Sequence, residues 1–171
     1  MSMSEKVKMA FPPVFDENSR VLILGSFPSV KSREISFYYG NKQNRFWKTV
    51  CGVFNLEIPE SIDGKITFLK ATSIALWDMV TECEIEGSSD ASIRVKKQAE
   101  LYPIFEKSKI EKVLLNGALA YELFEKKYGS YCRENQIAYV KMPSTSPANP
   151  RFTKEKWEKE LECLTKNYSK N

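Results

Sequence analysis

The chain has 171 residues, of which 42% are hydrophobic and 28% are charged, and its formal net charge is +4. This length suits a single domain, residues 1–171, and the composition indicates a globular protein rather than a disordered one. Because the chain contains no histidine, Ser-His-Asp triads, Cys-His pairs and the usual histidine-ligated zinc sites are excluded. The mildly basic charge permits a polyanionic partner without requiring one.

The cysteines and the N-terminal residues bear on the cellular compartment. Cys51, Cys83, Cys132 and Cys163 are far apart in the chain, which disfavours a disulfide scaffold, a zinc knuckle and an iron–sulfur cluster. Residues 1–15 contain no apolar signal-peptide core, and no apolar run approaches the roughly 20 residues that span a bilayer. We therefore expect a cytoplasmic monomer with free thiols, without a membrane span, a metal or a cofactor.

Apolar patterning predicts alternating strands and helices. Short, nearly continuous apolar runs are typical of strands buried on both faces, and apolar residues three or four apart are typical of helices. This alternation predicts an α/β fold, a three-layer α/β/α sandwich with a central four-stranded parallel sheet. In chain order we predict a strand at Arg20–Gly25, a helix at Asn44–Phe54, a strand at Ile74–Trp77, a helix at Gln98–Lys107, a strand at Lys112–Gly117, a helix at Ala118–Lys127, a strand at Ile137–Met142 and a helix at Thr153–Asn167 with Thr153 as its N-cap.

Polar loops follow three of the predicted strands. Gly25–Trp47 comes after the first strand, Asn116 stands at the end of the third, and Met142–Asn149 comes after the fourth. Because ligands of such sheets bind at the carboxyl ends of the strands, we expect these segments to converge on one crevice. Asp78 is the only acid at a strand end, and it could act as a general base or make structural hydrogen bonds.

Two of these loops resemble the motifs of a known family. The segments Gly25-Ser26-Phe27-Pro28-Ser29, Phe37-Tyr38-Tyr39 and Asn44-Arg45-Phe46-Trp47 resemble the first motif of the uracil-DNA glycosylase superfamily, and Met142–Pro147 resembles its second motif. The resemblance covers about residues 21–149 and is closest to the branch that removes hypoxanthine from deoxyinosine. The related mismatch-specific uracil/thymine glycosylases place a catalytic Asn directly after the first strand, where this chain has Ser26 and Phe27.

The resemblance implies a DNA glycosylase of base excision repair, with damaged DNA as its partner. Such an enzyme flips out a deaminated base, here hypoxanthine or uracil, and hydrolyses its N-glycosidic bond. We expect a monofunctional enzyme without strand cleavage, because a lysine nucleophile is not evident at the strand ends; Lys141, within a strand pattern, is the residue that could contradict this. Two alternatives remain: a glycosylase that prefers uracil, and a noncatalytic nucleic-acid or nucleotide-binding module on the same fold.

Within this resemblance, Asn44 is the candidate catalytic residue. Its side-chain oxygen can accept a hydrogen bond from water and orient that water toward the sugar C1′, although an amide is too weak a base to deprotonate it. The reaction should therefore be dissociative, with an oxocarbenium-like sugar. The alternative is that Asn44 only caps the helix that begins at Arg45.

The candidate base-binding residues are Tyr39, Asn116, Ser26 and Phe27. Tyr39 could stack on the flipped base, and we expect one residue of the Tyr38–Tyr39 pair to pack in the core. In the superfamily an Asn at the position of Asn116 often reads the base, and a carboxamide matches the N–H group and keto oxygen of uracil and hypoxanthine. The alternative for Asn116 is an Asx turn at the end of its strand. Ser26 and Phe27 would form the pocket wall.

Short hydroxyl side chains on the second loop suit contacts with DNA phosphates. The alternative is an ordinary loop that caps the last helix. The candidate DNA-binding residues are Ser29, Ser144, Thr145, Ser146, Asn149 and Arg151.

Overall fold

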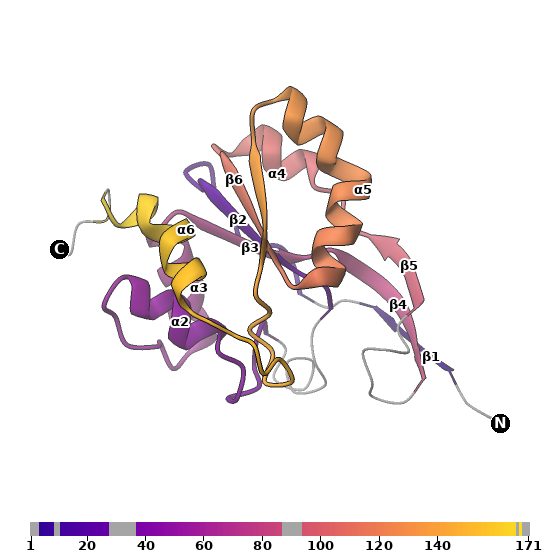
Figure 1. The fold of residues 1–171 in the computed structure, drawn as a ribbon, viewed down its shortest axis with the longest axis horizontal. Coiled ribbons are helices and arrows are strands. Elements are labelled where there is room, and N and C mark those ends of the chain that lie inside the picture. Colours follow the sequence, from indigo (N-terminus) through magenta and orange to yellow (C-terminus); the bar gives the residue numbers. More distant parts are fainter. Residues whose placement is uncertain (1–3, 9–10, 28–36, 87–93, 167, 169–171) are drawn as a thin grey trace.

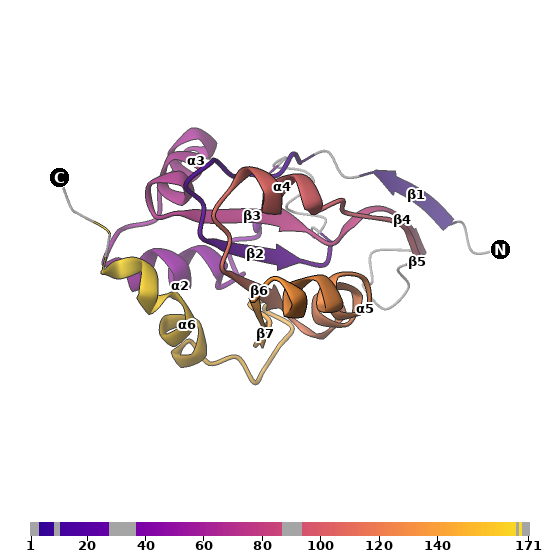
Figure 2. The ribbon, with the colours of Figure 1, turned by 90° about the horizontal axis from the view of Figure 1, so that it is seen from above.

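The centre of the fold is the predicted parallel sheet. We describe a computed structural model, which covers the chain except residues 1–3, 9–10, 28–36, 87–93, 167 and 169–171. All neighbouring strands of the sheet are parallel, in the order β3-β2-β6-β7, so β2 lies between β3 and β6 (Figure 2). The strands are β2 (Val21–Gly25), β3 (Ile74–Asp78), β6 (Lys112–Asn116) and β7 (Ala138–Met142).

Helices cover both faces of this sheet, which confirms the three-layer prediction (Figure 1). Successive residues of β2 point to opposite faces: Val21 and Ile23 pack with the helices α2, α3 and α6, whereas Leu22 and Leu24 pack with α4 and α5. All four of these side chains are fully buried. The helices are α2 (Phe46–Val53), α3 (Ile62–Ala71), α4 (Tyr102–Lys107), α5 (Ala118–Glu134) and α6 (Glu155–Thr165).

A second, antiparallel sheet was not predicted. Its strands are β1 (Ser4–Lys8), β4 (Val80–Glu86) and β5 (Arg94–Gln98), in the order β1-β4-β5. It continues directly from the central sheet, because Met79 alone separates β3 from β4, and the Met79 and Val80 N–H groups donate to the carbonyls of Gly25 and Ser26. The small sheet therefore begins at the carboxyl edge of the central one.

Several predicted helix bounds were wrong. Gln98 ends β5, and α4 begins only at Tyr102. The last helix begins at Glu155, and Thr153 does not cap it. Helix α3 was missed, although its N-cap Ser61 accepts a hydrogen bond from the Gly64 N–H at 2.9 Å, an ordinary helix-start signal.

Two global features concern membranes and metals. Within the described part of the chain, no helix combines the length and the apolar character needed to cross a bilayer. The same residues contain no group of three or more acidic or cysteine side chains arranged to hold a metal ion. Cys51, Cys83, Cys132 and Cys163 do not form disulfides with one another.

Candidate active site

Two loops meet the carboxyl end of strand β6 at the edge of the central sheet, so the three segments predicted to converge lie together. Asn116, the last residue of β6, donates from its amide nitrogen to the Tyr39 hydroxyl at 3.1 Å and to the Thr145 hydroxyl at 2.9 Å. Its amide oxygen accepts from the Thr145 N–H at 3.0 Å. Asn116 is 9% exposed and Thr145 is 1% exposed. The Asn116 carboxamide therefore joins the loop before α2 to the loop after β7.

This geometry limits how Asn116 can read a base. A carboxamide has two N–H donors and an oxygen with two lone pairs, and both donors of Asn116 already have protein acceptors. Beyond its three hydrogen bonds, Asn116 can accept one more through the second lone pair of its side-chain oxygen. An Asn116 N–H could therefore reach a keto oxygen only by giving up Tyr39 or Thr145, a constraint that the sequence could not reveal.

Tyr38 and Tyr39 divide between the core and the site. Tyr38 is 2% exposed, and its hydroxyl donates to the Pro12 carbonyl at 3.0 Å, so it takes the core position expected for one of the pair. Tyr39 is half-buried and has a left-handed backbone with a φ of 54°, which costs a non-glycine residue about 1–2 kcal/mol. Its ring stacks on Phe46, with centroids 4.0 Å apart. One face of Tyr39 is thus held by helix α2.

Asp78 lies beside Tyr39 across the backbone of Gly25. Gly25 and Asp78 are register partners in β2 and β3, and a Cβ atom on Gly25 would lie 2.5 Å from Asp78 Oδ1 and 2.9 Å from the Tyr39 hydroxyl. A glycine is therefore required here for the two side chains to approach the strand.

The Asp78 carboxyl is almost completely buried, which is unusual for an acidic side chain. The residue is 3% exposed, and its Oδ2 atom has no hydrogen-bond partner among the described residues. Burial raises the pKa of Asp78 to about 7, because an ionised carboxylate is disfavoured away from water. Burial also raises the pKa values of Tyr38 and Tyr39 well above their usual range, and the nearby Asp78 charge raises them further. Raised pKa values in a cluster of this kind are typical of functional sites.

Asn44 lies one residue before Arg45, the N-cap of helix α2, and its side chain bonds to the first N–H group of that helix. Its side-chain oxygen accepts from the Phe46 N–H at 2.9 Å, and its own N–H donates to the Asn41 carbonyl at 2.9 Å. The side chain is half-buried. Since an amide oxygen has two lone pairs, the bond to the Phe46 N–H leaves one of them for a water molecule.

Arg45 fixes the first loop to the second, a role that sequence reasoning missed. Its backbone N–H donates to the Thr145 carbonyl at 3.0 Å, and its guanidinium donates to the carbonyls of Ser146 at 3.3 Å and Asn149 at 3.1 Å. The guanidinium also lies 4.8 Å from the centre of the Phe152 ring. Figure 1 shows the two loops side by side, one before α2 and the other after β7. The one sequence signal was that an arginine follows Asn44 in the motif.

The second loop is held largely by its own side chains. The hydroxyls of Ser144 and Ser146 accept from N–H groups of the loop at 3.2 Å each, so their own hydrogens remain for a ligand. Asn149 donates to the Ser144 carbonyl at 2.9 Å and accepts from the Arg151 N–H at 3.1 Å. Contrary to the expectation of a solvent-facing hydroxyl, Thr145 points inward to Asn116. Among the described residues of the predicted DNA-binding set, Arg151 is the exposed one.

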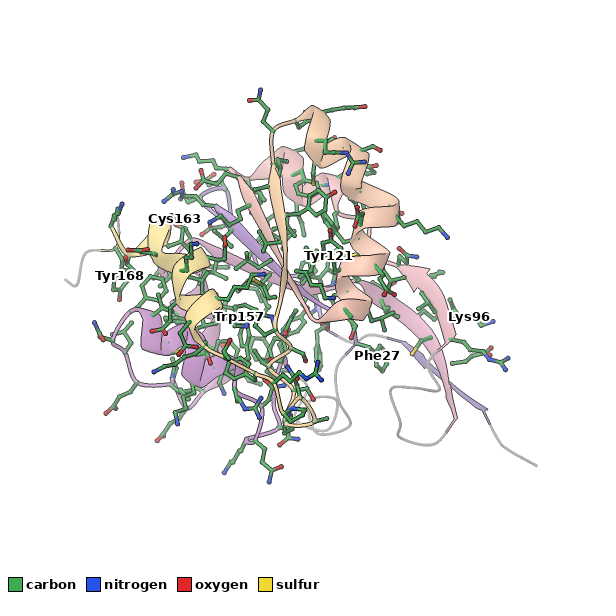
Figure 3. The ribbon with its side chains drawn as sticks, in the orientation of Figure 1. Phe27, Lys96, Tyr121, Trp157, Cys163 and Tyr168 are labelled. Carbon is green, nitrogen blue, oxygen red and sulfur yellow. The ribbon has the colours of Figure 1, made fainter. Side chains whose placement is uncertain are left out.

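The start of the first loop lies beside the small sheet. Phe27 packs with Val80 and Cys83 of β4, and Figure 3 shows it between α5 and the small sheet. Ser26 is half-buried, and its carbonyl accepts from the Val80 N–H at 3.0 Å. Pro28 and Ser29 lie outside the described residues.

Comparison with known proteins gives consistent matches over nearly the whole chain. The family model of the uracil DNA glycosylase superfamily matches residues 12–165. A protein of Methanosarcina acetivorans named hypoxanthine DNA glycosylase is 34% identical over 157 residues, which cover 89% of this chain and 96% of the relative. A protein of the same name from Methanosarcina barkeri is 35% identical over 88 residues, 51% of this chain and 56% of the relative. A solution NMR structure from M. acetivorans, described as a candidate uracil DNA glycosylase, has a TM-score of 0.79 and 32% identity, and the match covers 95% of this chain and 99% of that one.

Proposed function

The chain belongs to the uracil DNA glycosylase superfamily, and we propose that it removes hypoxanthine from deoxyinosine in DNA by hydrolysing the N-glycosidic bond, without cutting the strand. It is a DNA glycosylase for deaminated bases, as its relatives' names and its family indicate. The choice of hypoxanthine rests on the M. acetivorans and M. barkeri relatives that carry this name.

One observation about the site carries the proposal: Asn44 lies in a segment anchored at both ends to the carboxyl edge of the sheet. Tyr39 is hydrogen-bonded to Asn116 at the end of β6, and Arg45 is hydrogen-bonded to Thr145 after β7. The five residues between them, residues 40–44, therefore form an arch that is held at both ends above the carboxyl edge of the sheet, where ligands of such sheets bind. A half-buried amide in this arch can hold a water molecule in one orientation.

The reaction begins with extrusion of the base, since an enzyme cannot reach the C1′–N bond of a stacked nucleotide. We assign the stacking surface to Tyr39, whose ring is backed by Phe46 at 4.0 Å. Stacking of a base on an aromatic side chain contributes roughly 1–3 kcal/mol. Ser26 would line the base pocket. Phe27 would influence the pocket indirectly, by its packing against Val80 and Cys83 of the small sheet.

Bond cleavage then follows a dissociative course. The base departs first, and the oxocarbenium-like sugar is captured by the water that Asn44 orients. Asn44 does not need to be a strong base for this, because attack on a cation needs an oriented lone pair rather than a free hydroxide. Asn116 can accept an N–H of the base with its remaining lone pair, and it positions Tyr39 with its amide hydrogens.

The DNA backbone would lie along the second loop. Ser144 and Ser146 keep hydroxyl hydrogens for phosphate oxygens, and Arg151 is exposed beside them. Ser29 is proposed to contact a phosphate from the first loop. Thr145 and Asn149 would contribute by holding the loop, since their side chains bond within the protein.

The decisive experiment uses end-labelled oligonucleotides with one inosine, one uracil or no modified base. Inosine should yield abasic sites, seen as strand breaks after alkali and as intact strands before it. Breaks before alkali would contradict a monofunctional enzyme, and faster release of uracil would select the uracil-preferring alternative. Binding without release of either base would indicate a noncatalytic module.

A further inference from the structure

We propose that Asp78 is a further catalytic residue, a carboxylic acid that donates its proton to the hypoxanthine base while the glycosidic bond breaks. The proposal rests on the proposed function, because it concerns the departure of a purine. The steps described above use Asn44 to position water and Tyr39 to stack on the base, and they give the Asp78 carboxyl no role. The proposal supplies one.

The first support is the location of the carboxyl. Asp78 ends β3, and its Oδ1 lies over Gly25, next to the Tyr39 hydroxyl, at the edge where Asn116 also ends its strand. A base that stacks on the Tyr39 ring extends along that ring toward its hydroxyl end. Its polar edge would therefore approach the two groups that flank this end, Asn116 and Asp78.

The second support is the unpartnered oxygen. Asp78 Oδ2 is buried without a hydrogen-bond partner among the described residues, in a side chain that is 3% exposed. An unsatisfied buried polar group costs roughly 1–3 kcal/mol, more if it is charged. Such a group persists where a ligand supplies the missing partner, and here a base nitrogen or oxygen would do so.

The third support is the electrostatic environment. Burial raises the pKa of Asp78 to about 7, and the titratable groups that its charge acts on are the phenols of Tyr38 and Tyr39, whose raised pKa values leave both uncharged at neutral pH. The adjacent residues Gly25 and Ser26 of the neighbouring strand and loop bring no charge, and no lysine or arginine pairs with Asp78 in the described ranges. A carboxyl that is partly protonated near neutral pH can act as a general acid.

The proton and electron balance is simple. As the C1′–N9 bond breaks, its electron pair stays with the base, and the Asp78 proton moves to a ring nitrogen, so neutral hypoxanthine leaves and a carboxylate remains. Water adds to C1′, and the proton that it releases returns to Asp78 through the solvent. Uracil departs from its N1 atom as an anion whose charge is delocalised onto the neighbouring C2 keto group and, through the C5=C6 double bond, onto the C4 keto group, and it should therefore depend less on Asp78.

The test compares single-turnover release of inosine and uracil bases across pH for the wild type and Asp78→Asn. Below pH about 7 the acid is protonated, so wild-type release of hypoxanthine should be fastest there and decline as pH rises through this value. Asp78→Asn should slow hypoxanthine release at low pH by roughly 10²–10⁴-fold and flatten its pH profile. For uracil, Asp78→Asn should cause a smaller loss of rate and a smaller change in the pH profile.

The matched control is Asp63→Asn, at an exposed acid in the first turn of α3, which should keep the wild-type rates and profile. A wild-type profile that is the same for both bases would overturn the proposal without use of any variant. So would an Asp78→Asn enzyme that loses both activities equally. If the wild type releases neither base, the proposed function fails; if it releases both and Asp78→Asn retains the wild-type profile, only the role of Asp78 fails.

Discussion

The Asp78 carboxyl and the Gly25 backbone are in such close contact that a methyl group on Gly25 would lie 2.5 Å from Asp78 Oδ1. The same methyl would lie 2.9 Å from the Tyr39 hydroxyl. Gly25 therefore determines how near an acid and a phenol can come to the end of β2. The missing side chain matters more here than the flexibility of glycine, because this site needs room above the strand.

We predict that Gly25→Ala will destabilise the protein and reduce base release. The added methyl must displace both Asp78 and Tyr39, and overpacking of this kind costs roughly 1–3 kcal/mol. Urea unfolding and single-turnover assays measure the two effects. Gly52→Ala is the control, because a Cβ on this exposed residue of helix α2 meets nothing within 4 Å, and alanine should stabilise the helix by up to about 1 kcal/mol. Equal effects of the two substitutions would contradict the close contact.

Asn44→Ala should lower single-turnover base release by roughly 10²–10⁴-fold, because the water loses its oriented acceptor. It also removes the bond to the Phe46 N–H, the first N–H group of α2, and loss of one hydrogen bond costs about 0.5–1.5 kcal/mol. Ser61→Ala removes the N-cap hydrogen bond of α3, away from the site, and should cost about 0.5–2 kcal/mol in stability with no loss of activity. Binding to an abasic analogue should change little. If Asn44→Ala releases the base at the wild-type rate, the role of Asn44 is limited to its hydrogen bond with the Phe46 N–H.

The central sheet was predictable from sequence because β2, β3 and β6 are buried on both faces. Val21–Leu24 is a continuous apolar run with every residue fully buried, and such runs stand out in any chain. The small sheet lacks this signal: in β4 the apolar positions alternate with Glu82 and Glu84, and β5 contains two adjacent lysines. Period-two alternation was present in β4, but its charged residues resembled a solvent-exposed loop.

The candidate site was predictable as a location and not as a set of bonds. Strand ends placed Asn116 and Thr145 at one edge, and the structure joins them. Which partners the Asn116 amide takes depends on side-chain geometry, and so does the inward turn of Thr145. The contact of Arg45 with three carbonyls a hundred residues or more away in the chain has no sequence signature. The burial of Asp78 depends on Gly25 and Tyr39 together.

Substitution of Asn116 should distinguish reading of the base from support of the loops. Asn116→Ala removes the acceptor of the buried Thr145 N–H and the donor to Tyr39, so we expect a loss of roughly 1–3 kcal/mol in stability and slower release of both bases. Asn116→Asp restores the acceptor but not the donors, so it should recover stability relative to alanine without recovering activity. Unfolding curves and base release from inosine and uracil substrates measure both. Wild-type rates for both variants would make Asn116 purely structural.

Stability should depend on pH through Asp78. Its pKa is raised in the folded protein to about 7 from an ordinary value of 3.8, so between these values the folded state binds more protons than the unfolded state. Stability from this group is thus fully present below pH 3.8 and is lost as pH rises toward about 7, at up to about 1.4 kcal/mol per pH unit.

Asp78→Asn removes this ionisation and replaces the acid with a group of nearly the same shape. The variant should therefore gain stability relative to the wild type as pH rises from about 4 to about 7, and the difference should level off above that range. Urea unfolding at a series of pH values measures the difference. Asp63→Asn, the control, should lower stability at neutral pH, because an acidic side chain in the first turn of a helix interacts favourably with the helix dipole. A difference between Asp78→Asn and the wild type that stays constant across this range would mean that Asp78 ionises normally in the folded protein, and the carboxyl could then not serve as an acid near neutral pH.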